Sequence, residues 1–444
     1  MAAAAALALL AGGCSGDPSG PAAPAADAPS YGAHIPTGTP QGMRAKQVMD
    51  MLNSDWPIGH GNVSTLATPE AVEETIAGMD PLWWDRPVTL EHVEIGAGSA
   101  ALRVHNAYGA EHDIELSVDG DTLVDEFTVT LHPPRIGDWA DIDAVLGASG
   151  ARYSYQVARV ADGRCHRLAG ANTAESLPLA SIFKLYVLLA VADAVKAGTL
   201  SWDEELVLTE RAKALGSTVM EELQPGARVS VRWAAQQMIS VSDNVATDLL
   251  IERVGREAVE RALVAAGHHD PESMRPFPTM HELFSVGWGE PDLRERWKNA
   301  SRADRARLLA EADERPLNPD PDRTFSPGSA YGAEWYGSAE DICRLHVALQ
   351  RAAVGPAAPV RDILSAVPGI TLDRAVWPYI GAKGGNLPGD LTFSWYAEDR
   401  TGVPYVVSFQ LTWPQYRSRT AATWLLAIAQ QAFGLIQRDQ PAGR

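Results

Sequence analysis

The sequence predicts an α+β protein of two domains, and two features of the chain support this prediction. With 444 residues it is longer than one ordinary domain. Its first part is typical of helices followed by an antiparallel meander, whereas its second part has strands at both ends of a helical middle. The composition, 46% hydrophobic and 21% charged residues, is that of a globular protein. We therefore expect a small α+β domain followed by a larger one whose terminal segments meet in one sheet.

Residues 1–14 are predicted to be a signal peptide that ends in a lipidation site. The run is apolar, too short to cross a membrane, and closes on Leu10–Cys14, which is close to a bacterial lipobox with Cys14 as the lipidated residue. No Lys or Arg precedes Cys14, and an unprocessed Ala-rich N-terminus is the alternative. Residues 15–42, rich in Pro, Ala, Gly and Ser, are expected to form a flexible linker. We expect an exported protein, lipid-anchored at the outer face of the cytoplasmic membrane.

The net charge of −19 restricts the partners of the protein. Nucleic acids and anionic membrane surfaces do not attract an acidic body, so neither is an expected partner. No apolar run reaches the roughly 18 residues that a membrane-spanning helix needs, which leaves the lipid anchor as the expected membrane contact. We expect a monomer that acts on a small-molecule substrate.

Residues 43–135 are predicted to form the small α+β domain. Two amphipathic helices are followed by runs in which apolar and polar residues alternate, and Asp119-Gly120 between two of these runs is a strong hairpin signal. Pro133-Pro134 marks the boundary to the next domain. The predicted elements are helices 43–52 and 69–79 and strands 90–95, 101–105, 114–118 and 123–131.

Residues 143–437 are predicted to form the larger domain. Asp162-Gly163 joins its first two strands as a hairpin, and residues 399–402 form the turn between its two closing strands. Helices dominate residues 179–364, between these pairs of strands. The predicted strands are 154–160, 165–169, 392–397 and 403–411, and the last helix spans 420–436.

Ser181 and Lys184 form the first part of a candidate catalytic site. They lie one helical turn apart at the start of an apolar helix, and this spacing places both side chains on one face. A lysine in a desolvated pocket can lose its proton and activate a serine hydroxyl. The helix N-terminus offers N–H groups where an oxyanion would develop. The pair predicts a serine hydrolase with Ser181 as nucleophile, although such a pair alone occurs in many long chains.

Three motifs in order give the chain a resemblance to a known family. They are Pro178–Leu185 around the Ser-Lys pair, Met238–Leu250 around Ser242-Asp243-Asn244, and Lys383-Gly384-Gly385 before a strand-like run. They resemble the Ser-x-x-Lys, Ser-Asp-Asn and Lys-Thr/Ser-Gly elements of the class A β-lactamase and penicillin-recognising serine hydrolase family. The resemblance covers residues 143–437. It implies a helical lobe beside a lobe built on an antiparallel sheet, with the site in the cleft between them.

The resemblance also implies a role for each matching residue. Ser181 would be acylated, Lys184 would activate it, and Ser242 would relay a proton to the leaving nitrogen. Lys383 would hold the substrate carboxylate and lower the proton affinity of the relay. The backbone N–H groups of Ser181 and Asn386 would form the oxyanion hole. This chemistry requires neither a metal nor a cofactor. The implied substrate-binding residues are Asn244, Gly385 and Asn386.

Two departures from the family pattern concern substrate binding and deacylation. Gly384 occupies the position of the hydroxyl residue that binds the β-lactam carboxylate, so affinity is expected to be lower or differently directed. The family also uses a loop glutamate to activate the deacylating water, and the longer segment 270–337 contains no clear match. Glu290, followed by Pro291, imitates the motif but is more simply explained as a solvated residue in the first turn of a helix. Weaker candidates for the base are Asp320, Asp322 and Glu334.

The layout of residues 43–135 resembles a second known module. In two-domain actinobacterial lipoproteins, and in an accessory protein of clavulanic acid gene clusters, a steroid-isomerase-like (NTF2-like) domain precedes the β-lactamase-like one. No Asp and Tyr can be assigned here as an isomerase acid and base, so we interpret this domain as a supporting or binding domain.

Cys165, Cys343 and the pair His268-His269 are interpreted as structural. Two cysteines far apart in the sequence carry little information, so buried, inert thiols are expected in preference to a disulfide. His268-His269 lacks further ligands at a metal-binding spacing, and no metal site is expected.

The leading hypothesis is an exported serine hydrolase that forms an acyl-enzyme at Ser181 with β-lactams or related amides and esters. We expect weak β-lactamase activity because the loop glutamate is missing. The first alternative is a penicillin-binding-type D,D-carboxypeptidase or acyltransferase, in which the acyl-enzyme persists. The second is a non-catalytic lipoprotein that binds acyl or cell-wall compounds.

Overall fold

The computed structural model describes residues 31–210 and 219–439. They form two compact units, each with its own hydrophobic core. No helix in these two ranges is both long and apolar enough to cross a membrane. The predicted signal peptide with Cys14 lies outside the described residues. The larger unit comprises residues 136–417 and 426–439, and the smaller unit comprises residues 31–135 and 418–425.

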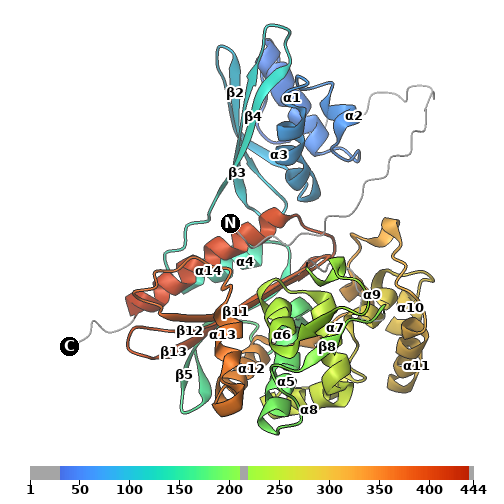
Figure 1. Cartoon of the computed structure of the whole chain (residues 1–444). Coiled ribbons are helices and arrows are strands. Elements are labelled where there is room, and N and C mark those ends of the chain that lie inside the picture. Colours follow the sequence, from blue (N-terminus) through green and yellow to red (C-terminus); the bar gives the residue numbers. More distant parts are fainter. Residues whose placement is uncertain (1–30, 211–218, 440–444) are drawn as a thin grey trace. The chain divides into compact units, whose positions relative to one another are not determined.

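The smaller unit is built on a four-stranded antiparallel sheet with helices on one face (Figure 1). Apolar and polar residues alternate along its strands, so that Ala100, Leu102 and Val104 of β2 are all buried. The hydroxyl of Thr39 caps the first helix by accepting the N–H of Gly42. The four strands lie where the alternation predicts them, and α2 is not among the predicted helices. The elements are α1 (Pro40–Leu52), α2 (His60–Val63), α3 (Val72–Trp84), β1 (Thr89–Ile95), β2 (Ser99–His105), β3 (Glu111–Val118) and β4 (Val124–His132).

The larger unit contains a five-stranded antiparallel sheet in the order β11-β12-β13-β5-β6. Because β13 pairs with β5, segments from the two ends of the unit meet in one sheet, as the sequence predicts. Strand β11, which carries Lys383, is missing from the predicted strands because its glycines have a low strand propensity. The strands are β5 (Arg152–Ala161), β6 (Arg164–Ala171), β11 (Tyr379–Leu387), β12 (Asp390–Glu398) and β13 (Pro404–Thr412).

Helices cover both faces of this sheet (Figure 1). Adjacent residues of β12 point to opposite faces, as the period of a strand requires. Trp395 contacts Phe433 of α14 (Arg419–Asp439), whereas Tyr396 packs with Val347 of α12 (Ala339–Ala352). The sheet is therefore buried on both sides, which fixes the position of its edge strand β11.

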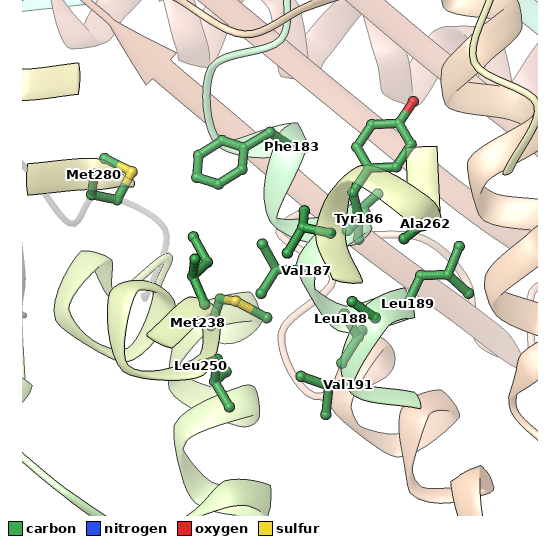
Figure 2. Close-up of a cluster of buried hydrophobic side chains, with 14 of the residues drawn as sticks. Phe183, Tyr186, Val187, Leu188, Leu189, Val191, Met238, Leu250, Ala262 and Met280 are labelled. Atoms are coloured by element: carbon green, nitrogen blue, oxygen red, sulfur yellow. The ribbon is translucent and has the colours of Figure 1, made fainter. Parts of the chain in front are cut away.

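Helix α5 (Lys184–Lys196) lies at the centre of the helical part of the larger unit. Most of its side chains are buried, as expected for a helix that is apolar on nearly all sides. Figure 2 shows Leu188 and Val191 of this helix close to Met238 and Leu250 from two others. Close packing of this kind holds the start of α5 rigidly. The other helices are α4 (Trp139–Ala148), α6 (Val231–Ser240), α7 (Asn244–Val254), α8 (Arg256–Ala266), α9 (Met280–Trp288), α10 (Arg294–Lys298), α11 (Arg302–Asp313) and α13 (Pro359–Ser365), and the short strands are β7 (Leu177–Pro178), β8 (Glu205–Val207), β9 (Arg228–Ser230) and β10 (Tyr336–Gly337).

Cys165 of β6 and Cys343 of α12 form a disulfide, so the prediction of two separate thiols is wrong. The two residues are 178 positions apart in the sequence and come together because α12 packs against the sheet. Their neighbours include Ala158 and Val347, which belong to the same small apolar cluster. No local pattern in the sequence reports a contact of this kind, because it depends on how distant segments pack.

Candidate active site

Ser181 lies in the one-turn helix η1 (Ala180–Phe183), between β7 and α5. The other residues of η1 are buried, whereas Ser181 keeps part of its surface accessible. Ala180 has a φ of 42°, in the left-handed region that costs an alanine about 1–3 kcal/mol. Thr392 holds this turn from the sheet, because its hydroxyl donates to the carbonyl oxygen of Leu179 at 2.9 Å. The surrounding structure therefore maintains a strained backbone that presents Ser181.

Lys184 is fully buried at the first position of α5, immediately after the helix η1 that carries Ser181. Its Nζ donates to Ser242 O at 2.5 Å, to Ser242 Oγ at 3.1 Å and to Asn244 Oδ1 at 2.5 Å. Burial lowers the pKa of Lys184 to about 7, against the opposing effect of the charges of Asp243 and Asp248. A substantial fraction of Lys184 is therefore neutral near pH 7 and able to accept a proton. Among the described residues, Lys184 Nζ donates to Ser242 and Asn244 and not to Ser181 Oγ.

Ser242 occupies the turn between α6 and α7, with a left-handed φ of 60°. Its hydroxyl oxygen lies 3.1 Å from Lys184 Nζ and 3.0 Å from Lys383 Nζ, so one hydroxyl connects two lysines. The next residue, Asp243, uses its carboxylate to accept backbone N–H groups, among them that of Ala246 at 2.8 Å. This caps α7 and fixes the turn. The arrangement allows Ser242 to pass a proton between the lysines and a bound molecule.

Lys383 projects from the edge strand β11 and is buried. Its Nζ contacts Ser242 Oγ and the carbonyl oxygen of Gly384. Burial lowers the pKa of Lys383 well below its ordinary value, and the nearby charge of Lys184 lowers it further. Because the two ammonium groups repel each other, the pair holds fewer than two protons at neutral pH.

Strand β11 passes directly against the backbone of the nucleophile. A Cβ atom on Gly385 would lie 2.4 Å from the backbone nitrogen of Ser181, so only glycine fits there. The following residue, Asn386, is exposed. Because β11 is an edge strand, alternate N–H groups point away from β12 and are available to a ligand. The structure thus brings the predicted oxyanion-hole residues, Ser181 and Asn386, into neighbouring positions.

Asn244 lies at the start of α7 and is buried. Its side-chain oxygen accepts the hydrogen bond from Lys184. The sequence-based role of Asn244, to orient a substrate amide, is therefore combined with a contact that holds the lysine.

The predicted acidic candidates Glu290 and Asp320 form ion pairs with Arg323. Asp322, beside them, is exposed. In the part of the chain that the structure describes, no hydrogen bond or ion pair connects these carboxylates with Ser181, Lys184 or Ser242. The ion pairs of Glu290 and Asp320 stabilise the segment 270–337, and none of the three carboxylates is placed to act as the base.

Glu334 is buried behind the nucleophile segment. Its Oε1 accepts the N–H of Trp335 at 2.7 Å, and the N–H of Ala180 also donates to this carboxyl. Among the described residues, Glu334 Oε2 and Asp390 Oδ2 are buried without a hydrogen-bond partner. Burial and the neighbouring Asp390 raise the pKa of Glu334 well above its ordinary value, and burial raises that of Asp390 to about 7. Burial therefore disfavours the charged carboxylate of Glu334, the form that a general base needs, and its Oε1 already accepts the N–H of Trp335. Both observations argue against Glu334 as the deacylating base.

Asp248 is a buried residue near the site that the sequence-based reasoning missed. It lies one turn beyond Asn244 on α7, and burial raises its pKa to about 8. Its carboxyl oxygens accept the N–H groups of Met280 at 2.7 Å and His281 at 2.9 Å, which anchors the start of α9. The available signal was an acidic residue within an otherwise apolar helical run, which indicates a buried partner.

His268, His269 and Asp341 come within 4.8 Å of one another through their ligand-type atoms. The sequence shows only the two histidines, because Asp341 belongs to the distant helix α12. The carboxylate of Asp341 accepts the N–H groups of His269 and Ser338 at 2.8 Å each. Its oxygens are therefore occupied in capping α12, and this cluster has a structural explanation.

Two family models match the chain. Residues 139–350 match the model of the beta-lactamase enzyme family, and residues 35–124 match a model described as ORF 12 gene product N-terminal. The recognition of the β-lactamase and penicillin-recognising serine hydrolase family is thereby confirmed. The predicted fold class is confirmed as well: a separate N-terminal α+β domain precedes a β-lactamase-like domain. The NTF2-like character of the first domain stays a prediction.

Known relatives of the larger unit include β-lactamases and a penicillin-binding protein. The extended-spectrum β-lactamase PER-1 of Pseudomonas aeruginosa is 38% identical over 91 residues, which are 20% of this chain and 29% of that enzyme. The β-lactamase of Sphaerobacter thermophilus is 23% identical, with 67% of this chain and 98% of that chain covered and a TM-score of 0.45. The chromosome-encoded β-lactamase of Vibrio parahaemolyticus is 17% identical, with 68% and 99% covered and a TM-score of 0.47. PBP-A is 15% identical, with 70% and 100% covered and a TM-score of 0.47.

Proposed function

We propose that this protein is a serine hydrolase that forms an acyl-enzyme at Ser181 with β-lactams or related amides and esters. One observation carries the proposal: the hydroxyl of Ser242 lies within hydrogen-bond distance of both Lys184 and Lys383, at 3.1 and 3.0 Å. Both lysines have a pKa lowered by burial. A base and a proton relay are thus present next to an accessible serine.

Acylation follows from this arrangement. Ser181 Oγ attacks the carbonyl carbon of the substrate, and its proton passes to the neutral amine of Lys184. The negative charge that develops on the carbonyl oxygen is stabilised by the N–H groups of Ser181 and Asn386. The bond to the leaving nitrogen or oxygen then breaks, and the leaving atom takes a proton through the hydroxyl of Ser242. The product is an ester between the acyl group and Ser181, with Lys184 neutral again.

Deacylation requires a water molecule that reaches the carbonyl carbon of this ester and a base that takes the proton of that water. Four carboxyl groups are suggested for this role by the sequence. Glu290 and Asp320 are bound to Arg323, Asp322 is exposed, and burial raises the pKa of Glu334 well above its ordinary value. These observations support slow deacylation. They also favour a second candidate function, a penicillin-binding-type D,D-carboxypeptidase or acyltransferase with a long-lived acyl-enzyme.

Export and anchoring are part of the proposal. The apolar run of residues 1–14 with Cys14 supports a lipid-anchored protein outside the cytoplasm. The disulfide between Cys165 and Cys343 agrees with an oxidising compartment. We propose that the protein acts there as a monomer on a small molecule.

The test uses a fluorescent penicillin and a chromogenic cephalosporin with the full chain. We expect covalent labelling that is absent in Ser181→Ala and present in Ser201→Ala, an exposed serine outside the site. Labelling that survives in Ser181→Ala refutes the proposal. Stable labelling with no cephalosporin turnover favours the penicillin-binding function. Slow deacylation is contradicted if the cephalosporin is turned over faster than the penicillin label is lost from the protein.

A further inference from the structure

An aromatic ring covers the position where the family has a hydroxyl. Gly384 and Phe393 are directly opposite each other on the neighbouring strands β11 and β12. A Cβ atom on Gly384 would lie 2.9 Å from both Cδ1 and Cε1 of this ring. Threonine or serine at position 384 would therefore require the ring to move away. Gly384 and Phe393 form one feature, in which the ring has replaced the hydroxyl.

The glycine opposite this ring lies on β11 between two residues that contact the reacting groups, whereas the ring itself shares a face of β12 with Trp395. Gly384 is flanked by Lys383, whose Nζ contacts Ser242 Oγ, and by Gly385, which touches the backbone nitrogen of Ser181. A molecule bound between the nucleophile and the edge of β11 therefore reaches the surface over Gly384.

Phe393 is both held in place and partly accessible. Its neighbours on β12, Thr392 and Ser394, are fully buried, whereas Phe393 is half-buried. Its ring stacks on Trp395 with a centroid distance of 5.7 Å and an interplanar angle of 23°. Packing on one side and accessibility on the other are typical of a residue that forms the wall of a binding site.

The surroundings of the ring are unfavourable for a carboxylate. The ring face carries a negative partial charge and offers no hydrogen bond. Lys383, the nearest cation, has a pKa well below its ordinary value because it is buried next to Lys184. Ser394 does not supply the missing hydroxyl, because its Oγ is buried against His346 at 2.9 Å and the carbonyl oxygen of Lys383 at 3.2 Å.

We propose that Gly384 and Phe393 form an apolar subsite that selects substrates with a neutral, apolar group at the position where β-lactams carry their carboxylate. The substrate class is then a neutral ester or amide. This inference rests on the proposed acyl-enzyme at Ser181 and specifies which compounds form it. Phe393 is the specificity-determining residue of the subsite.

The test compares benzylpenicillin with its methyl ester, a pair in which the charged carboxylate is replaced by a neutral methyl ester. Acylation rates are measured by intact-mass spectrometry for the wild type, Phe393→Ala, Phe393→Leu and the double variant Gly384→Thr/Phe393→Ala. We expect the wild type to react faster with the ester, and Phe393→Ala to lose about tenfold of that preference, since truncation removes part of the apolar contact of one ring. Phe393→Leu keeps an apolar side chain and retains most of the preference. The double variant shifts further towards the free acid.

Leu168→Ala is the matched control, because Leu168 is an exposed apolar residue on β6, at the opposite edge of the sheet. Its ester-to-acid ratio is expected to equal that of the wild type. A wild type that prefers the free acid, or a Phe393→Ala variant with an unchanged ratio and a native unfolding transition, overturns the subsite.

Binding of the same two compounds to Ser181→Ala, measured by calorimetry, separates the subsite from the chemistry. If neither compound acylates the wild type, the proposed function fails. The subsite is still supported if Ser181→Ala binds the ester more tightly than the acid and Phe393→Ala abolishes the difference. Equal binding of both compounds to Ser181→Ala refutes it.

Discussion

Replacing Lys184 by methionine is expected to change the free energy of unfolding in a pH-dependent way, with an effect that is more favourable at low pH than at high pH. Burial lowers the pKa of Lys184 from 10.5 to about 7, so the native state binds fewer protons than the unfolded chain between these values. Above pH 10.5 Lys184 is neutral in both states and does not lower the free energy of unfolding. As the pH falls from 10.5 to about 7, the unfolded chain takes up a proton that the native state does not, so the free energy of unfolding decreases. The shift corresponds to a penalty of about 5 kcal/mol below pH 7. At pH 9 the penalty is about 2 kcal/mol.

Methionine also removes the hydrogen bonds that Lys184 donates to Ser242 O and Asn244 Oδ1, which costs about 1–3 kcal/mol each at every pH. The informative quantity is therefore the change with pH of the difference in unfolding free energy between Lys184→Met and the wild type. We expect this difference to be about 3 kcal/mol more favourable to the variant at pH 6 than at pH 9.

Urea denaturation of both proteins at a series of pH values measures this difference. Lys196→Met, at the exposed end of the same helix, is the control and should show little change with pH. A difference that is the same at pH 6 and pH 9 refutes the reasoning, because Lys184 would then have an ordinary pKa despite its burial. The same variant should lose acylation by roughly 10²–10⁴-fold, the contribution typical of a general base.

Further predictions concern the nucleophile, its backbone and the disulfide. Acylation by a neutral ester should rise with pH around a midpoint of about 7, since Lys184 must be neutral to act; a rate that falls over this range contradicts its role. Gly385→Ala should reduce acylation more than tenfold, because the new Cβ would lie 2.4 Å from the nitrogen of Ser181; unchanged labelling would show that the close approach is unimportant. Alanine at both Cys165 and Cys343 should lower the unfolding free energy by up to about 5 kcal/mol, since the bond links residues 178 positions apart; equal urea midpoints would contradict this. Glu334→Gln should leave the deacylation rate unchanged, because burial raises the pKa of Glu334 and disfavours the carboxylate that a base needs; slower loss of label would restore it as the base.

Local patterns in the sequence were sufficient to predict most strands of the two large sheets. Alternation of apolar and polar residues predicts β2 and β3 within a few residues, because each of these strands has one side chain facing in and the next facing out. The hairpin turns predict β5, β12 and β13, which are buried on both faces. The pattern fails for β11. Its glycines are required by the close approach to Ser181 and by the ring of Phe393, and these are contacts with other segments.

In the candidate site, too, some features follow from local sequence and others only from contacts between distant segments. Ser181 and Lys184 are neighbours on one helical turn, so their spacing alone predicts that they act together. The sequence also supplied Ser242 and Lys383 by resemblance, and the tertiary structure showed that one hydroxyl joins the two lysines. Asp248 was overlooked because its partners, the N–H groups at the start of α9, belong to another segment.

By itself the sequence determined the two-domain α+β organisation and the serine hydrolase family, because these depend on periodicity and on short motifs, and it predicts Ser181 as the nucleophile. Only the tertiary structure decided the disulfide, the raised pKa of Glu334 beside Asp390 and the close approach of the Phe393 ring to Gly384. Each of these is a contact between segments far apart in the chain. Burial at such contacts sets pKa values and selectivity, and burial is a property of the packed molecule.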